Sequence, residues 1–425
     1  MKTLIKNVYA FLPDGTTPLT NIMIDKDKIV GVGEVPTDFH AAKIIDGKDK
    51  FAVPGFVNAH THASMTLFRS YADDMNLMDW LNNMIWPAEA KMQEEDIYWG
   101  AMLAAVEMIE GGTTSFVDMY GPYMEKVAEV AIDSGLRAVL SRGIIGVAPD
   151  GDKKLEENVS LFNDFHGAEH GRITVMFGPH APYTCPPDFL KKVSAAAKKC
   201  GAEVHIHMAE TKAEIEQITK TYGKRPFRYV EETGLFESGT LAAHCVHLDD
   251  EDIAIIKKYG IRVAHNPGSN MKLASGVAPV PRLLKEGVCV ALGTDGASSN
   301  NNLDMLEEIN LAAMLHKVNT LDPLAVPART ALKMGTEYGA KAAGLKNVGK
   351  IEKGCKADLT LFNMNSAAWY PRNDLASLLV YSAHADSADT VLVDGKVLME
   401  GRELLTLDKE RIFFEAQKCA ERLTK

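Results

Sequence analysis

The chain has 425 residues, of which 46% are apolar and 24% charged, and its formal net charge is −11. This length allows one large catalytic domain with a smaller companion, and the composition excludes a disordered or low-complexity protein. Because no run of lysine and arginine interrupts the acidic balance, we expect neither a nucleic acid nor a membrane surface as a partner.

Cysteine use and the first residues of the chain bear on its compartment. The six cysteines are far apart and include no Cys-x-x-Cys pair, which argues against a disulfide framework and against a thiolate zinc site. The N-terminus leads into a short alternating stretch instead of an apolar signal core, and no segment has the run of about 18–20 apolar residues that a membrane span needs. We therefore expect a cytoplasmic protein.

Residues 1–54 and 346–425 share a texture of short strands separated by turns. We expect these two ends to pair into one small β-sandwich, and two independent β tails are the alternative. Strands are predicted over residues 3–8, 21–24, 28–32, 357–361 and 390–393, and a closing helix over residues 409–423.

Residues 55–345 instead alternate buried-looking strands with helical patterns such as 95–110 and 187–199. Eight strands alternating with helices predict an α/β fold, a (β/α)8 barrel of the TIM type, inserted between the two halves of the sandwich. The predicted barrel strands cover residues 55–59, 115–119, 138–141, 174–177, 203–206, 241–243, 262–264 and 289–292.

Catalytic groups of such a barrel project from the C-terminal ends of its strands. The first predicted strand ends in His60-Thr61-His62, and two imidazoles at i and i+2 of a strand point to the same face, where both can meet one ion. For this motif alone, a hydrogen-bonded pair of core histidines is an equal alternative.

Metal-binding side chains recur at later strand ends, which weakens that alternative. The fifth strand ends at His207, the sixth gives His244, the seventh His265 and the eighth Asp295. Three imidazoles and one carboxylate, with a position left open for water, describe a catalytic site for one divalent metal ion, and we expect zinc. The predicted ligands are His60, His62, His207 and Asp295.

Two pairs of histidines leave a choice. His205 and His207 lie on the same strand face, and we prefer His207 because it is nearer the strand end and three residues before Glu210. His205 is then a deeper interior group. For the sixth strand we prefer His244 over His247, because His244 stands at the strand end.

Together these residues resemble the amidohydrolase superfamily, and the resemblance covers nearly the whole chain. It is carried by Pro54-Gly55-Phe56-Val57-Asn58-Ala59-His60-Thr61-His62, His207-x-x-Glu210, Ala243-His244-Cys245 and Gly293-Thr294-Asp295-Gly296. Within the superfamily the chain resembles the 5-methylthioadenosine/S-adenosylhomocysteine deaminases, through Trp86-Pro87-Ala88-Glu89, Gly178-Pro179-His180-Ala181-Pro182-Tyr183, His265-Asn266-Pro267-Gly268-Ser269-Asn270 and residues 293–301. Guanine deaminases and chlorotriazine hydrolases share several of these motifs.

The resemblance implies hydrolytic deamination of a 6-aminopurine nucleoside to an inosine-type product and ammonia. Asp295 would accept a proton from the attacking water, Glu210 would protonate purine N1, and His244 would hydrogen-bond the attacking oxygen. Other superfamily reactions, such as guanine deamination or triazine dechlorination, are the alternative, and a non-catalytic binding or scaffold relative is a remote one. A homo-oligomer is a family-level expectation.

Substrate contacts also follow from the resemblance. Glu89 would hold the ribose hydroxyls, His180 would contact the nucleoside, and Arg142 would help to bind an amino-acid carboxylate. An exposed first-turn acid is the alternative for Glu89, and a salt bridge at the barrel mouth is the alternative for Arg142. Where the family can present a second arginine this chain has Lys154, preceded by Lys153, and a lysine keeps the charge but loses the bidentate fork.

Overall fold

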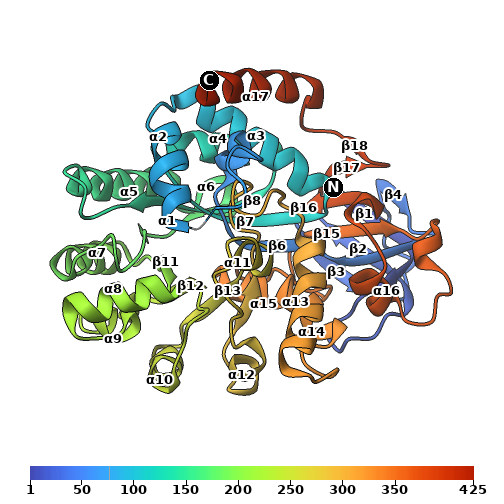
Figure 1. Cartoon of the computed structure of the whole chain (residues 1–425). Coiled ribbons are helices and arrows are strands. Elements are labelled where there is room, and N and C mark those ends of the chain that lie inside the picture. Colours follow the sequence, from blue (N-terminus) through green and yellow to red (C-terminus); the bar gives the residue numbers. More distant parts are fainter. Residues whose placement is uncertain (76) are drawn as a thin grey trace.

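Eight parallel strands form a barrel at the centre of the chain, in a computed structural model that describes residues 1–75 and 77–425 (Figure 1). The barrel strands are β6 (Phe56–Thr61), β7 (Thr113–Tyr120), β8 (Arg137–Ile144), β9 (Ile173–Val175), β11 (Val204–Met208), β12 (Thr240–His244), β13 (Arg262–His265) and β14 (Val290–Leu292), and the short β10 (Gly178–Pro179) pairs with β8. Each of the eight barrel strands overlaps a strand predicted from the sequence, whereas β10 was not predicted, so the TIM-type barrel is confirmed.

Two hydrogen-bonded sheets, β10-β8-β7-β6 with β9 on β8 and β11-β12-β13-β14, join to close the barrel. The His205 amide donates to the Phe177 carbonyl at 2.9 Å, which joins the fourth and fifth strands. At the other seam the Asp295 amide donates to the His60 carbonyl, also at 2.9 Å. This second bond brings the segment after the last strand against the end of the first, where the predicted ligands stand.

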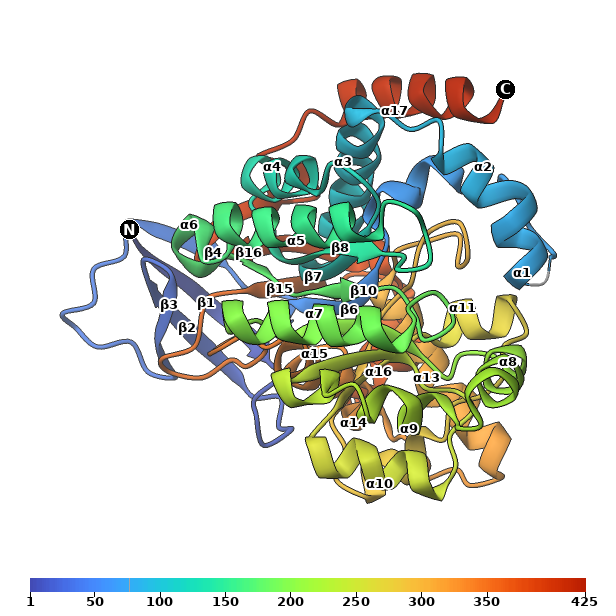
Figure 2. The ribbon, with the colours of Figure 1, turned by 90° about the vertical axis from the view of Figure 1, so that its left-hand side faces the viewer.

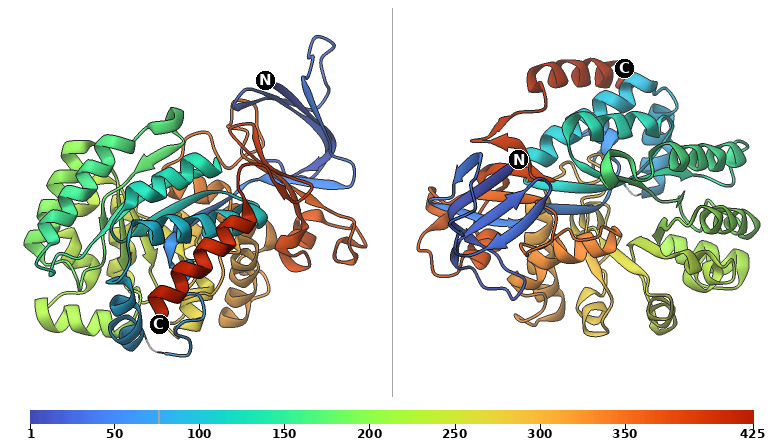
Figure 3. Two further views of the ribbon diagram at one scale, coloured as in Figure 1. Left: turned by 90° about the horizontal axis from the view of Figure 1, so that it is seen from above. Right: turned by 180° about the vertical axis from the view of Figure 1, so that it is seen from behind.

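Helices surround the barrel, and their ends carry the expected signals (Figure 3). In α10 the Asp249 side chain accepts from the Asp252 amide at the start, and Gly260, with φ of 61°, ends the helix. The longer helices are α3 (Glu94–Glu110), α4 (Met124–Ser134), α5 (Gly151–Phe165), α7 (Pro187–Cys200), α8 (Lys212–Tyr222), α10 (Asp250–Tyr259), α13 (Met305–Thr320) and α17 (Lys409–Thr424). The shorter ones are α6 (Ala168–Gly171), α9 (Pro226–Glu231), α11 (Pro267–Lys272), α12 (Val280–Lys285), α14 (Ala328–Met334), α15 (Glu337–Ala342) and α16 (Leu375–Tyr381).

One segment between β6 and α3 lies over the end of the barrel that is away from the β-sheet of the chain ends (Figure 2). It contains η1 (Ala63–Phe68), α1 (Leu77–Trp80), the π-helical turn η2 (Leu81–Ile85) and α2 (Trp86–Glu89). Pro87 stands in the first turn of α2, where its missing N–H costs nothing. This segment therefore covers the carboxyl ends of the strands.

Both chain ends build one nine-stranded sheet, in the order β18-β17-β16-β15-β5-β1-β2-β3 with β4 on β1. Its central pair is β5 against β15, antiparallel, with Val53 opposite Thr360, so the two ends are not independent tails. The boundaries at residues 54/55 and 345/346 stay a prediction. The strands are β1 (Lys2–Ala10), β2 (Leu19–Asp25), β3 (Lys28–Val32), β4 (Lys43–Asp46), β5 (Lys50–Pro54), β15 (Leu359–Asn363), β16 (Ala388–Val393), β17 (Lys396–Glu400) and β18 (Glu403–Leu404).

A buried ion pair connects the barrel to this sheet. Arg137, at the start of β8, donates to Asp358 at 2.8 Å and to Asp394 at 2.6 Å, and the Arg137 and Asp358 side chains are at most 3% exposed. Removing one partner would leave a buried charge uncompensated, which is strongly destabilising. The six cysteines lie unpaired, and none of the described helices is long and apolar enough to cross a membrane.

Candidate active site

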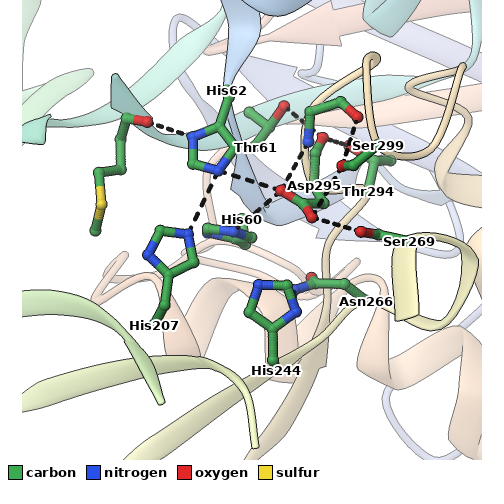
Figure 4. Close-up of polar contacts among 12 residues, drawn as sticks. His60, Thr61, His62, His207, His244, Asn266, Ser269, Thr294, Asp295 and Ser299 are labelled. Atoms are coloured by element: carbon green, nitrogen blue, oxygen red, sulfur yellow. Dashed lines mark hydrogen bonds and ion pairs between the residues drawn. The ribbon is translucent and has the colours of Figure 1, made fainter. Parts of the chain in front are cut away.

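The predicted metal ligands converge at the carboxyl end of the barrel (Figure 4). His60 Nε2 lies 3.4 Å and His62 Nε2 3.2 Å from Asp295 Oδ1, and His207 Nε2 lies 3.4 Å from His62 Nε2. Ligand atoms of His60, His207 and His244 also lie within 4.8 Å of one another. Four strands far apart in the sequence thus bring four imidazoles and one carboxylate to a single point.

Each of the three predicted imidazole ligands is held by its other ring nitrogen. His62 Nδ1 donates to the Met119 carbonyl, and His207 Nδ1 donates to the His180 carbonyl at 2.7 Å. A donating Nδ1–H leaves the Nε2 lone pair free to bind a metal. His60 Nε2 is buried without a hydrogen-bond partner among the described residues. An orphaned ring nitrogen beside two further imidazoles and a carboxylate fits a divalent metal ion.

His205 is the partner that holds His60. Its Nε2 lies 2.9 Å from His60 Nδ1, on the side away from Asp295. His247 Nε2 bonds the Ser275 carbonyl at 2.7 Å, and His265 Nε2 lies 3.1 Å from His316 Nε2. These three histidines therefore lie outside the cluster that His60, His62, His207, His244 and Asp295 form, and the choice of ligands within it stays a prediction.

Charge and burial set the protonation of the cluster. Burial lowers the pKa of His60 to about 4 and holds the pKa of His207 well below its usual value, so both rings are neutral at pH 7. Burial would also lower the pKa of His62, but the hydrogen bond and charge of Asp295 raise it to about 9. His62 and Asp295 thus form an ion pair, whose proton a bound cation would displace.

Two serines orient the Asp295 carboxylate. Ser269 and Ser299 donate to Asp295 Oδ2 at 2.6 Å and 3.0 Å, which leaves Oδ1 facing His60 and His62. Sequence reasoning did not single out these serines, although both stand in motifs that carried the resemblance. Ser299 stands four residues after the predicted ligand Asp295, which is a usable signal, whereas Ser269 is near no predicted ligand in the sequence.

The carboxyl ends of these strands carry backbone strain. Ala209, His244 and Asp295 have φ of 51°, 71° and 61°, values that side-chain-bearing residues rarely adopt. Strain of this kind persists where the surrounding structure fixes it, and it gathers at functional sites. Three strands thus end in strained residues around one point.

His244 and Glu210 face each other beside the cluster, with Nε2 and Oε2 3.8 Å apart. His244 Nδ1 lies 2.9 Å from Asn270 Oδ1 and 3.3 Å from Asn266 Nδ2, and these contacts hold the ring with Nε2 toward Glu210. Burial raises the pKa of the Glu210 carboxyl, although the charge of His244 lowers it. The arrangement places one proton donor and one acceptor next to the predicted ion.

Glu214, on α8, fixes the loop that carries Glu210. Its two carboxylate oxygens accept from the backbone amides of Ala209 and Glu210 at 2.9 Å and 2.8 Å. Burial raises the pKa of Glu214 to about 8, against the effect of these two bonds. Because this clamp is formed by backbone groups, sequence reasoning had no means of finding it.

A cavity of about 440 Å³ opens from this cluster, between the barrel mouth and the segment α1–α2. Glu89, Arg142 and His180, the predicted substrate contacts, all line it. One wall is apolar and consists of Leu77, Trp80, Leu81 and Ile85. The cavity has the size and mixed lining of a small-molecule site.

Glu89 and His180 differ in their settings. Glu89 is half-buried, and burial raises the pKa of its carboxyl although the Tyr120 hydroxyl, by hydrogen bonding, lowers it. His180 Nδ1 lies 3.0 Å from the Thr184 hydroxyl, and burial lowers the pKa of His180 to about 3. His180 is therefore a neutral hydrogen-bonding group at pH 7.

Comparison with known proteins agrees with this geometry. Residues 51–398 match the amidohydrolase family. The chain belongs to the amidohydrolase family. It is 54% identical, over 97% of its length and 95% of the relative, to a 5-methylthioadenosine/S-adenosylhomocysteine deaminase of Pelotomaculum thermopropionicum. A deaminase of the same name from Dictyoglomus thermophilum is 51% identical over the full length of both chains.

A solved structure extends the likeness to three dimensions. An adenosine deaminase from Xanthomonas campestris with bound zinc is 33% identical, with a TM-score of 0.94 over 99% of this chain and 98% of that one. The amidohydrolase assignment and the histidine cluster together identify this chain as a divalent-metal hydrolase.

Charged residues form the mouth of this amidohydrolase cavity. Arg142 donates from Nε to Glu157 at 2.8 Å and from Nη1 to the Gly143 carbonyl at 2.7 Å. Lys154 Nζ lies 2.8 Å from Asp150 Oδ1, and Lys153 Nζ lies 3.8 Å from Glu157 Oε1. The salt bridge expected as an alternative for Arg142 is thus present, at a position that still lines the cavity.

Proposed function

We propose that this amidohydrolase hydrolytically deaminates a 6-aminopurine nucleoside, 5′-methylthioadenosine or S-adenosylhomocysteine, to the inosine-type product and ammonia. The observation that carries the proposal is one cavity with the histidine–aspartate cluster and Glu210 at its inner end and Glu89 on its wall. Full-length relatives at about half identity, which bear this activity in their names, support the same substrate class.

The donor atoms of the histidine–aspartate cluster suit one divalent metal ion, and this ion is part of the proposal. His60, His62, His207 and Asp295 would hold one divalent ion. When bound, such an ion supplies Lewis-acid chemistry and makes hydroxide available at neutral pH by lowering the pKa of water from about 16 toward 7. We propose zinc, which the Xanthomonas campestris structure contains, although three imidazoles and a carboxylate also accept iron, manganese or nickel.

The side chains around the ion would move the protons. Asp295 accepts a proton from the attacking water as the new oxygen bond to purine C6 forms. Glu210, which burial favours in its protonated form, donates to purine N1 so that no negative charge builds up in the ring. His244 hydrogen-bonds the attacking oxygen. The C6–N bond then breaks as Asp295 passes its proton to the departing amine, which leaves as ammonia. The remaining proton of the C6 hydroxyl returns to Glu210 as the product carbonyl forms.

The remaining cavity residues would bind the nucleoside. The Glu89 carboxylate accepts from the two ribose hydroxyls, and neutral His180 hydrogen-bonds the nucleoside. Arg142 carries a positive charge at the mouth, where the 5′ substituent of the substrate would lie. We also propose that the nucleoside substrate is the small-molecule partner of the protein, that the protein is cytoplasmic and that it forms a homo-oligomer.

A deaminase assay tests the proposal, with methylthioadenosine, adenosylhomocysteine, 5′-deoxyadenosine, adenosine and guanine as substrates and metal analysis of the same sample. We expect the ultraviolet absorbance change of adenine-to-hypoxanthine conversion with one or both thioether nucleosides. Turnover of guanine alone, or a rate that Glu89→Ala leaves intact, would establish the base-deaminase alternative. Absence of turnover with every compound would overturn the substrate assignment and leave the assignment as a divalent-metal hydrolase standing.

A further inference from the structure

The ion pair at the cavity mouth joins two elements that approach the substrate from different sides. Arg142 lies near the end of β8 and Glu157 lies on α5. The Arg142 residue is only 6% exposed, whereas the Glu157 side chain is 37% exposed. Both residues line the cavity. The pair is therefore fixed on its arginine side and open to the cavity on its carboxylate side.

Each member of the pair keeps unused hydrogen-bonding capacity. Arg142 spends Nε on Glu157 Oε2 and Nη1 on the Gly143 carbonyl, and Nη2 has no partner among the described residues. On the other side, Glu157 Oε1 accepts no hydrogen bond from the described residues, and Lys153 Nζ lies 3.8 Å from it, beyond hydrogen-bonding distance. One free donor and one free acceptor consequently lie side by side.

The other charges at the mouth are already paired or exposed. Lys154 is compensated by Asp150 at 2.8 Å, and the Lys153 side chain is 75% exposed. Glu157 partly neutralises the positive charge of Arg142, so Arg142 would attract a substrate group that carries only a carboxylate less strongly. A group that carries an ammonium beside its carboxylate would complement both members of the pair.

We infer that Glu157 is a specificity-determining residue that accepts the α-ammonium of a zwitterionic amino-acid tail while Arg142 Nη2 takes the tail's carboxylate. This inference rests on the proposed function, because the tail is the homocysteine part of adenosylhomocysteine. The 5′-methylthio group lacks both charges and lies against the apolar wall of Leu77, Trp80 and Leu81. One cavity thus accepts two 5′ substituents by different chemistry.

A merely positioning role for Glu157 makes a different prediction. If Glu157 only held Arg142 in place, its loss would weaken every carboxylate-bearing tail equally, with or without an amino group. If Glu157 accepts the ammonium, its loss penalises only tails that carry one. Substrate analogues that lack the amino group, the carboxyl group or both separate the two roles.

The test compares Glu157→Gln with wild type on four substrates: adenosylhomocysteine, its deamino analogue, its decarboxylated aminopropylthio analogue and methylthioadenosine. Glutamine keeps one oxygen for Arg142 Nε but places an NH₂ group where the ammonium would lie. We expect kcat/KM for adenosylhomocysteine to fall about tenfold relative to the deamino analogue, as for loss of one hydrogen bond to a charged group. The aminopropylthio analogue should fall with it.

Glu156→Gln is the matched control, because Glu156 is exposed on the same helix and does not line the cavity. It makes the same change in charge, and we expect it to leave the substrate ratios as in wild type. Equal losses for adenosylhomocysteine and its deamino analogue in Glu157→Gln, or no change in their ratio, would overturn the inference.

Wild-type enzyme provides a second measurement that needs no folded variant. Its KM for the aminopropylthio analogue should be lower than for a propylthio analogue without the amine, and an equal or higher KM overturns the inference. If the KM values overturn the inference but methylthioadenosine is still deaminated in the same experiment, the proposed function remains supported. Failure of the proposed function is distinct, because no adenine-containing substrate would then be turned over.

Discussion

The inner end of the cavity and its mouth differ in how their side chains are held and directed. At the inner end, His60, His62 and His207 are each held at Nδ1 and directed at one point by Nε2. At the mouth, the buried Arg142 donates to Glu157 and to the Gly143 carbonyl, and the Glu157 carboxylate is partly exposed. The side chains of the inner end all face one point and suit one chemistry, whereas the pair at the mouth keeps an unused donor and an unused acceptor and can suit more than one 5′ substituent. The reaction and the choice of 5′ substituent should therefore respond to different substitutions.

The largest effect is expected from His207→Ala. Removing one of three imidazoles from a buried site should abolish metal binding and lower kcat/KM by at least about 10³-fold, because both attack and proton transfer depend on this site. Metal analysis of the purified variant, with the deaminase assay, measures both effects. His40→Ala, at an exposed position, is the control. Full metal occupancy in His207→Ala would contradict the proposed ligand set.

Glu210→Gln should separate chemistry from metal binding at the inner end. The amide cannot donate a proton to N1 in the way the protonated carboxyl does, so we expect kcat to fall about 10²- to 10⁴-fold with bound metal unchanged. Steady-state kinetics and metal analysis on one preparation give both numbers. Turnover close to wild type would remove Glu210 from the proton-transfer role.

Glu214→Gln probes the clamp behind Glu210. One of its two oxygens becomes an NH₂ group, which cannot accept from the Ala209 or Glu210 amide. We expect kcat to fall about tenfold to a hundredfold, with bound metal retained, because a positioning contact of this kind acts through the residue it holds. Glu216→Gln, exposed on the same helix, should behave as wild type. An unchanged kcat in Glu214→Gln would show that the loop holds Glu210 without the clamp.

The smallest effect is expected on the pH dependence of thermal stability. It is tested by comparing the buried carboxyl of Glu308 with the exposed carboxyl of Glu156. Glu308 accepts from the Gly268 amide and from Asn300, and burial raises its pKa to about 8. Because the folded-state pKa lies above the unfolded value of about 4.5, its stabilisation is complete below pH 4.5. It is lost as the pH rises to about 8, by at most about 1.4 kcal/mol per pH unit.

Glu308→Gln removes this loss. The Tm of the variant minus that of wild type should therefore increase between pH 5 and pH 8 in thermal unfolding. Glu156→Gln, at an exposed position on α5, should show a difference in Tm that is independent of pH. Parallel curves for Glu308→Gln and wild type would contradict the assignment of a buried protonated carboxyl.

The same contrast explains what could be predicted from the sequence. Strand periodicity located the barrel, and polar residues directly after buried strands located His60, His62, His207 and Asp295, because strand ends in a closed barrel meet at one edge. That the two ends of the chain pair with each other followed from their matching textures, although β5 was not among the predicted strands. These features depend on local pattern, which the sequence carries.

Other features depend on three-dimensional proximity or on backbone groups. Glu214 bonds two amides, and a backbone donor has no sequence signature. The approach of Glu157 to Arg142 depends on how α5 packs beside β8, and the sequence offered Lys153 and Lys154 as equally plausible groups at the mouth. The serines on Asp295 stood in recognised motifs, but their hydroxyl directions required coordinates.

Metal dependence of the deaminase reaction tests the central claim most directly. The enzyme is stripped with a chelator, zinc is returned in measured steps, and deamination of methylthioadenosine is followed by absorbance against the zinc bound per chain. We predict no activity in the stripped enzyme and a recovery that is proportional to bound zinc and complete at one ion per chain. Deamination that persists without metal, or that needs a second ion per chain, would contradict the account.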